Sequence, residues 1–238
     1  MRPASGSCAA PNRTVVEDVL RNDLMDRIDQ IVQERSLLKH PFYQAWTKGT
    51  LPLESLKGYA AEYYHFEAAY PTFLSGLHYR CSDRRVRHLL LENLWDEEHG
   101  PDNHVELWLR FCDALGIDRD QVVSGEPTEA TVDLVATYQR LTSDEPLAAG
   151  ASALYAFESQ VPGVAREKIR GLREFYSLED DDSVSFFRVH QTLDEEHSEA
   201  DREMIVALAP TEAESTFALE ATDDATKALW RFLDGVYS

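Results

Sequence analysis

The stretch that decides the fold is 186–205, FFRVHQTLDEEHSEADREMI, because it places three potential metal ligands on the apolar side of one helix. At about 100° per residue, His190, Asp194 and His197 fall within roughly 60° of one another on the helical wheel. The bulky apolar residues of the stretch share that face. Burying two imidazoles and a carboxylate costs free energy unless a partner compensates them, and a divalent metal ion does so directly. The alternative is a satisfied core histidine beside a surface acid pair.

Two other segments place a charged or imidazole side chain among apolar helical neighbours. In LLLENLWDEEHGPDNHVELWLRF, Glu97 and His104 lie seven residues apart and are nearly in phase on a helix. In SALYAFESQVPG, the single Glu158 shares its face with alanines, Leu154 and Tyr155, where a lone carboxylate has no structural explanation.

The three segments together offer three carboxylates and three imidazoles: Glu97, His104, Glu158, His190, Asp194 and His197. Oxygen and nitrogen donors without thiolates suit iron or manganese, and six ligands are enough for two ions. A single zinc ion would leave buried ligands unused.

A second ligand register competes with this one, because the motif DEEH occurs twice, at 96–99 and at 194–197. Ferritin-like bundles use two acid-x-x-His pairs and two single glutamates. The corresponding set here is Asp96, His99, Asp194, His197, Glu158 and either Glu62 or Glu67. It ranks second because it puts His99 on a charged face and leaves two apolar-face histidines without a ligand role.

Length and composition indicate one globular domain. The chain has 238 residues, 43% of them hydrophobic, and we expect a disordered start at 1–14 followed by a single helical domain at 15–238. No apolar run reaches the roughly 18 residues that a membrane span needs, and the start lacks the apolar centre of a secretion signal. We therefore expect no membrane association.

Charge and cysteine usage narrow the location and the partners. The formal charge of −20 repels phosphate backbones and argues against nucleic acid as a partner. The three cysteines are Cys8, Cys81 and Cys112, an odd number without a close pair, so neither a disulfide framework nor a thiolate metal site is indicated. A reducing cytoplasm is the expected location.

The chain consists of amphipathic segments separated by turn signals, without an alternating strand pattern. Eight helical pieces with short connections predict an all-α bundle. We expect a loop at 118–128 and helices at 15–38, 40–47, 53–79, 84–115 with an interruption at Gly100 and Pro101, 130–141, 147–176 with a bend near Pro162 and Gly163, from 182 onward, and 211–237.

These motifs resemble those of the haem-oxygenase-like di-metal oxidases, and most of all the 4-aminobenzoate synthases related to the chlamydial protein associating with death domains. The similar pieces, within about 37–208, are HPFYQAWTKG, DEEHGPDNHVELW, FESQVPGVAREKIRGL and the H-x3-D-x2-H of 190–197. The resemblance implies a haem-oxygenase-like bundle of about seven to eight helices. It places the metal ligands on the six residues selected above, which favours that register over the ferritin-like one.

The resemblance also implies a self-sacrificing reaction. In that family an internal tyrosine is thought to supply the ring of 4-aminobenzoate, a folate precursor, and an internal lysine its amino group. By motif position these residues are Tyr43 and Lys168. The implied cofactors are two metal ions, Fe/Fe or Fe/Mn, with dioxygen and a reductant as co-substrates. The implied partners are an external electron donor and a second copy of the chain in a homodimer.

Two features depart from the family pattern or its simplest geometry. The chain has Phe157 where relatives carry a second tyrosine, so we expect Tyr155 or Tyr64 to serve in its place. Lys168 lies ten residues beyond Glu158, about 15 Å along a straight helix, so a bend, side-chain reach or a conformational change must bring it to the ring.

Three other functions stay open at this point. The metal centre could oxidise an external small amine or fatty acid, which predicts many turnovers and an elongated pocket. The chain could be a non-enzymatic interaction module, although surface binding does not require six buried ligands. Cysteine-dependent chemistry is less favoured, because Cys112 lies in a helix and not beside an acid pair.

Overall fold

The computed structural model describes residues 13–237, and within this range every regular element is a helix. The prediction of an all-α bundle is confirmed. The predicted disordered start lies outside the described residues except for its last two, which begin the first helix. The α-helices are α1 (Arg13–Glu34), α2 (Pro41–Thr47), α3 (Leu53–Arg80), α4 (Arg84–Glu98), α5 (His104–Ala114), α6 (Arg119–Ser124), α7 (Glu129–Ser143), α8 (Leu147–Glu158), α9 (Val161–Tyr176), α10 (Asp181–Leu208) and α11 (Glu212–Val236), with a 3-10 helix, η1 (Leu37–Lys39), after α1.

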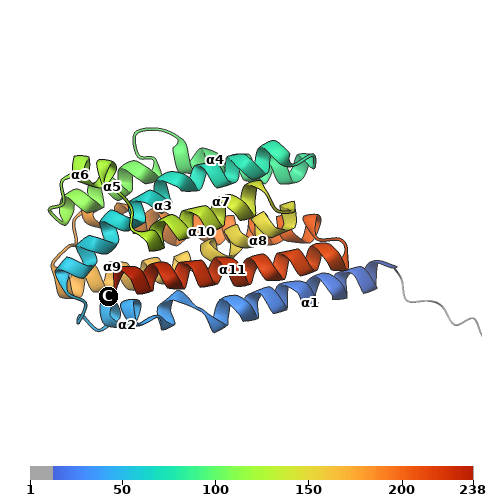
Figure 1. Ribbon diagram of the computed structural model, residues 1–238, viewed down its shortest axis with the longest axis horizontal. Coiled ribbons are helices and arrows are strands. Elements are labelled where there is room, and N and C mark those ends of the chain that lie inside the picture. The colour runs from blue at the N-terminus through green and yellow to red at the C-terminus, as the bar shows by residue number, and fades with distance from the viewer. Residues whose placement is uncertain (1–12, 238) are drawn as a thin grey trace, which may run out of the picture.

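The long helices lie side by side in an elongated bundle (Figure 1). The first and last helices, α1 and α11, pack together on one side of the bundle, and α4 and α5 lie on the opposite side. Between them α8 packs against α11, α10 and α7, so it occupies the centre of the molecule.

Central position explains the composition of α8, LAAGASALYAFE. Every residue of 148–158 is buried, and the many small side chains let neighbouring helices approach closely. At Gly150 an added Cβ would lie 2.4 Å from Cδ2 of Leu77 on α3. Because α8 ends at Glu158, it delivers that carboxylate into the interior of the bundle.

Two predicted helices are each divided into two, and the breaks position the site. The interruption predicted at Gly100 and Pro101 within 84–115 is confirmed: the helix ends at Glu98 and restarts at His104, with Gly100 at φ +82° and the Asn103 side chain accepting from the Glu106 backbone N–H. The predicted bend near Pro162 is a full break at residues 159–160, because proline suits the first turn of a new helix.

A helix that the sequence analysis missed, α6, lies in the predicted loop at 118–128. Asp118 caps it by accepting from the backbone N–H groups of Asp120 and Gln121 at 2.9 and 3.2 Å. This helix and the two breaks account for more helices than the seven or eight expected.

Among the described helices, none combines the length and the apolar composition needed to cross a bilayer. Cys81 and Cys112 are both free and buried.

Candidate metal centre

The six predicted ligands all lie in the interior of the bundle, each at most 6% exposed. The break between α4 and α5 places Glu97 in the last turn of one helix and His104 at the first position of the next. Three ligands come from successive turns of α10, which begins after an acidic N-terminus capped by Asp180. The sixth, Glu158, comes from the end of α8.

Short contacts divide these ligands into two groups. In the first, Nδ1 of His104 lies 2.8 Å from Oε2 of Glu97. In the second, Nδ1 of His197 lies 3.5 Å from Oδ1 of Asp194. His190 donates from Nδ1 to the Phe186 carbonyl at 2.8 Å, a contact that orients the ring and leaves Nε2 as its ligand atom.

Glu158 is held by two donors on the same oxygen. The Tyr70 hydroxyl and the Asn93 amide donate to its Oε1 at 2.6 and 2.8 Å. Its other oxygen, Oε2, and Oδ2 of Asp194 are buried and receive no hydrogen bond from a donor group, and Nδ1 of His197 has only its 3.5 Å contact with Asp194. A buried polar atom without a partner costs about 1–3 kcal/mol. The orphaned atoms are oxygens and an imidazole nitrogen, so the donor set fits iron or manganese.

The electrostatics of the cluster indicate that a positive charge would stabilise it. Burial, with a smaller contribution from the Glu158 charge, raises the pKa of Asp194 to about 7, although contact with His197 opposes the shift. Burial holds the pKa of His190 well below its usual value, and the charge of His104 adds to this effect. A divalent cation inverts this balance, since it favours anionic carboxylates and neutral imidazoles.

The sequence analysis did not select Asp201, a buried acid on α10, and it placed Glu67, a buried acid on α3, only in the second ligand register. Asp201 is fully buried, and burial, the Glu158 charge and a hydrogen bond with the Glu158 carboxyl raise its pKa well above the usual value. It lies four residues after His197 on the ligand face, so the helical wheel could have found it. Glu67, on α3, is 3% exposed.

The structure leaves two members of the ferritin-like register, His99 and Glu62, outside the cluster. His99 is exposed and stacks on Trp95 with ring centroids 3.9 Å apart. The carboxylate of Glu62 accepts from the backbone N–H of Thr128 at 3.0 Å, at the start of α7. Asp96 is half-buried, with Oδ2 at 3.2 Å from Nε2 of His197, on the outer side of that ring.

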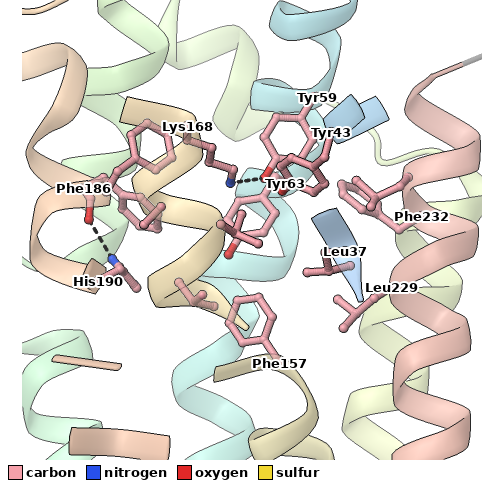
Figure 2. Close-up of a pocket in the computed structure, with 15 residues that line it drawn as sticks. Leu37, Tyr43, Tyr59, Tyr63, Phe157, Lys168, Phe186, His190, Leu229 and Phe232 are labelled. Carbon is pink, nitrogen blue, oxygen red and sulfur yellow. Dashed lines mark hydrogen bonds between the residues drawn. The ribbon is translucent and has the colours of Figure 1, made fainter. Parts of the chain in front are cut away.

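Tyr43 and Lys168 lie in the core and line one cavity together with the candidate ligand His190 (Figure 2). Lys168 is 5% exposed and its Nζ donates to the Tyr59 hydroxyl at 2.7 Å. That hydroxyl lies 3.4 Å from the hydroxyl of Tyr43. Nζ is also 4.9 to 5.9 Å from the ring centroids of Tyr43, Trp46, Tyr59, Tyr63, Trp108 and Phe187. This aromatic box encloses the amine.

The box changes the chemistry of both groups. Burial lowers the pKa of Lys168 to about 7, with the charge of Glu67 acting in the opposite direction, so a large fraction of the amine is neutral at pH 7. Burial raises the pKa of the Tyr43 phenol, which stays protonated. A neutral amine beside a neutral phenol is the state in which lysine acts as a nucleophile.

A cavity of about 30 Å³ lies between the aromatic box and the candidate ligand His190. Tyr43, Tyr59, Tyr63 and Lys168 line one side, and His190 and Phe157 line the other (Figure 2). A space of this size holds a water molecule or a diatomic gas, and drug-sized ligands need about 300–1,000 Å³.

The tyrosines that border this region are not those expected to replace the family tyrosine. The Tyr155 hydroxyl donates to Asp29 at 2.5 Å and accepts from Arg202 at 2.9 Å, and Tyr155 does not line the cavity. Tyr64 is half-buried and does not line it either. Tyr59, Tyr63 and Tyr70 recur at helical spacing on α3, a signal that the sequence contained.

The break between α8 and α9 resolves the predicted 15 Å separation of Lys168 from Glu158, because the two residues belong to different helices. Gln160 lies at this break, and its side chain makes two hydrogen bonds that hold the neighbouring segments together. Its Nε2 donates to the Ala156 carbonyl at 2.7 Å, and its Oε1 accepts from the backbone N–H of Leu37 at 2.8 Å.

Comparisons with solved structures identify the fold. A domain of unknown function with a haem-oxygenase-like fold from Shewanella denitrificans superposes with a TM-score of 0.72 at 21% identity, covering 92% of this chain and 91% of that one. A TenA homolog from Pseudomonas syringae pv. tomato superposes with a TM-score of 0.78 at 16% identity, covering 90% and 91%. The predicted haem-oxygenase-like fold is confirmed.

Sequence comparisons identify the family. The model of a family described as iron-containing redox enzymes matches residues 57–233. A 4-aminobenzoate synthase of Nitrosomonas europaea is 44% identical, over 91% of this chain and 92% of that protein, and one of Chlamydia muridarum is 40% identical over 94% and 93%. A pyrroloquinoline-quinone synthase of Ruegeria pomeroyi is 30% identical over 91% of each chain. The chain therefore belongs to the family of iron-containing redox enzymes.

Proposed function

We propose that this enzyme forms 4-aminobenzoate from its own Tyr43 and Lys168 in an oxygen-dependent reaction at a dinuclear metal centre. The observation that carries the proposal is the buried lysine. Its Nζ lies 5.6 Å from the centroid of the Tyr43 ring and shares Tyr59 as a hydrogen-bond partner with that ring. A lysine 5% exposed, in a box of six aromatic rings, has no evident structural purpose.

The reaction removes atoms from both side chains. The Cα–Cβ bond of Tyr43 breaks, which leaves a glycine at that position, and Cβ is oxidised from a methylene to a carboxylate. The nitrogen of Lys168 replaces the phenol oxygen on the ring, and that oxygen leaves as water. The Nζ–Cε bond breaks, and Cε is left as an aldehyde. Two molecules of dioxygen, with two electrons and two protons from an external donor, balance these changes and form one further molecule of water.

Glu97, His104, Glu158, His190, Asp194 and His197 would hold the two ions, which are Fe/Fe or Fe/Mn. When bound, the ions supply the activation of dioxygen. The chain itself orients and protects the reactants. The Tyr59 hydroxyl sits between amine and phenol, and the aromatic box keeps the amine free of bulk water.

The size of the cavity favours internal over external reactants. An elongated pocket beside the ligands is expected for an oxidase of fatty acids or amines, and the cavity at this position measures about 30 Å³. Chemistry at Cys112 is disfavoured, because the thiol is fully buried and burial raises its pKa to about 12.

The proposal is tested with protein made from ring-¹³C tyrosine and ε-¹⁵N lysine. Purified protein receives Fe(II), alone or with Mn(II), a reductant and oxygen, but no aromatic precursor. We expect 4-aminobenzoate that carries both labels, at no more than one molecule per chain. Unlabelled product, or many turnovers per chain, contradicts self-sacrifice and supports an external substrate.

Matched variants separate these residues from their neighbours. Tyr43→Phe and Lys168→Arg should abolish the product. Tyr64→Phe and Lys57→Arg change the same residue types outside the cavity and should leave the yield unchanged. An unchanged yield from Tyr43→Phe would remove the tyrosine assignment.

A further inference from the structure

Glu67 brings a further carboxylate to the metal ligands from a helix that carries none of the six. It lies on α3 and is 3% exposed. One oxygen of Glu67, one ring nitrogen of His104 and one of His190 all lie within 4.8 Å of one another. A single ion can contact three donor atoms at such separations, since metal–ligand bonds to oxygen and nitrogen are about 2.0–2.2 Å long.

We propose that Glu67 is a seventh protein ligand of the dinuclear centre and that it binds the ion held by His104 and His190. This inference rests on the metal centre of the proposed function and is independent of the fate of Tyr43 and Lys168.

Seven donors separate into two unlike sites. Glu97 joins the first site through its 2.8 Å contact with His104, so the first site consists of Glu67, Glu97, His104 and His190. The second site consists of Asp194 and His197, which are in contact, and Glu158, whose charge acts on both. The first site has two imidazoles and two carboxylates, and the second has one imidazole and two carboxylates.

Burial supports a ligand role for Glu67 over a structural one. A carboxylate in the core is costly unless it is paired or coordinates a metal. Tyr63 donates a hydrogen bond to Glu67 and His104 lies close to it, but the adjacent Glu97 carboxylate opposes the charge of Glu67. A cation between Glu67 and Glu97 removes the repulsion that these two carboxylates otherwise share.

The position of Glu67 also makes the first site the one next to the reactants. His190 lines the cavity, and Glu67 follows Tyr63 and Tyr59 by four and eight residues on the same face of α3. The ion of the first site would therefore face the cavity that Lys168 and Tyr43 border.

Anomalous scattering from crystals of the wild-type chain soaked with Mn(II) tests the inference directly. We expect a Glu67 oxygen about 2.0–2.2 Å from the ion of the first site. An ion in this site with both Glu67 oxygens more than about 3 Å away would overturn the assignment and leave the six-ligand centre intact. Absence of both ions from the soaked wild-type crystal would refute the dinuclear centre itself.

A variant provides the second readout, by chelator competition on folded protein. Glu67→Gln keeps the shape of the side chain, and we expect the affinity of the first site to fall at least tenfold while the second site keeps its ion. Glu62→Gln is the matched control on the same helix, because Glu62 contacts Thr128 at the surface. Equal affinities of the wild type and Glu67→Gln for two ions would contradict a ligand role.

Discussion

The buried amine of Lys168, on α9, donates to the hydroxyl of Tyr59, on α3, at 2.7 Å, and Lys168 is the only buried basic residue of α9. The position is unfavourable for stability, because burial lowers the pKa of the amine to about 7 from a reference of about 10.4. A side chain placed at such a cost suggests a functional constraint, and its removal should stabilise the fold.

We expect Lys168→Met to raise the free energy of unfolding by about 3 kcal/mol near pH 7, after allowance for the lost hydrogen bond. In the wild type the unfolded chain binds the proton more tightly than the folded chain, so the penalty is complete below pH 7 and shrinks as pH rises toward 10.4. Urea unfolding at pH 6 and pH 9 measures this. The gain should be smaller at pH 9, and Lys57→Met, at a half-buried position, should show neither effect.

Gly171 tests how closely α9 must approach Trp46. An added Cβ would lie 2.5 Å from Cδ1 of Trp46, a fully buried ring that stacks on Tyr43 with centroids 6.2 Å apart. Gly171→Ala should destabilise the protein by about 1–3 kcal/mol through overpacking and should lower the product yield. Chemical denaturation checks the first effect and the single-turnover assay the second.

Gly58→Ala is the control, since nothing lies within 4 Å of a Cβ added there on α3. It should stabilise the protein by about 0.5–1 kcal/mol through helix propensity. If Gly171→Ala and Gly58→Ala changed the free energy of unfolding to a similar extent, the contact with Trp46 would not limit how closely α9 packs.

Metal binding should stabilise the folded chain. Saturation of one site at one hundred times its dissociation constant adds about 2.7 kcal/mol, so Fe(II) or Mn(II) should raise the Tm of metal-free protein by several degrees. His190→Ala should reduce this rise by at least half. His99→Ala removes a histidine that stacks on Trp95 outside the cluster and should leave the rise unchanged. A rise that both variants preserve would point to ions bound elsewhere.

Phe157→Tyr introduces the tyrosine that the family resemblance places at this position. The Phe157 ring lines the cavity and packs against Phe66 and Tyr70 at centroid distances of 5.2 and 5.4 Å. The cavity accepts a hydroxyl, so we expect a stability change of less than about 1 kcal/mol. The single-turnover rate should rise several-fold, because a second oxidisable ring then stands beside Glu158. Phe66→Tyr, at a fully buried ring outside the cavity, should instead destabilise the fold.

The ligands on α10 were predictable because one uninterrupted helix carries them. A fixed period and apolar neighbours are sufficient to place His190, Asp194 and His197 on one buried face. Glu97 and His104 were selected by their phase on one helix, but they belong to two helices, and the break between them sets their 2.8 Å contact. The shared helical phase thus selected two buried residues that are in contact, but the contact arises from the break and not from one continuous helix.

The rings around Lys168 were beyond the reach of local pattern, because they come from α2, α3, α5 and α10. Its burial was not, since Val164, Ala165 and Leu172 share its face of the helix. Only the family resemblance identified this residue. Glu67 likewise shares its face of α3 with Tyr63, Tyr70 and Leu74, but its proximity to His104 and His190 depends on how the helices pack, which a single helical wheel does not contain.

Gln160 connects the break between α8 and α9 to a third segment of the chain, the 3-10 helix that begins at Leu37. Its side chain accepts from the backbone N–H of Leu37, in the segment that precedes Tyr43. This hydrogen bond joins that segment to the start of α9, the helix that carries Lys168. The two hydrogen bonds of Gln160, to Leu37 and to α8, therefore influence the positions of both Tyr43 and Lys168. Gln160 also follows Glu158 by two residues, so a change at this position would displace the two reactants and the Glu158 carboxylate together.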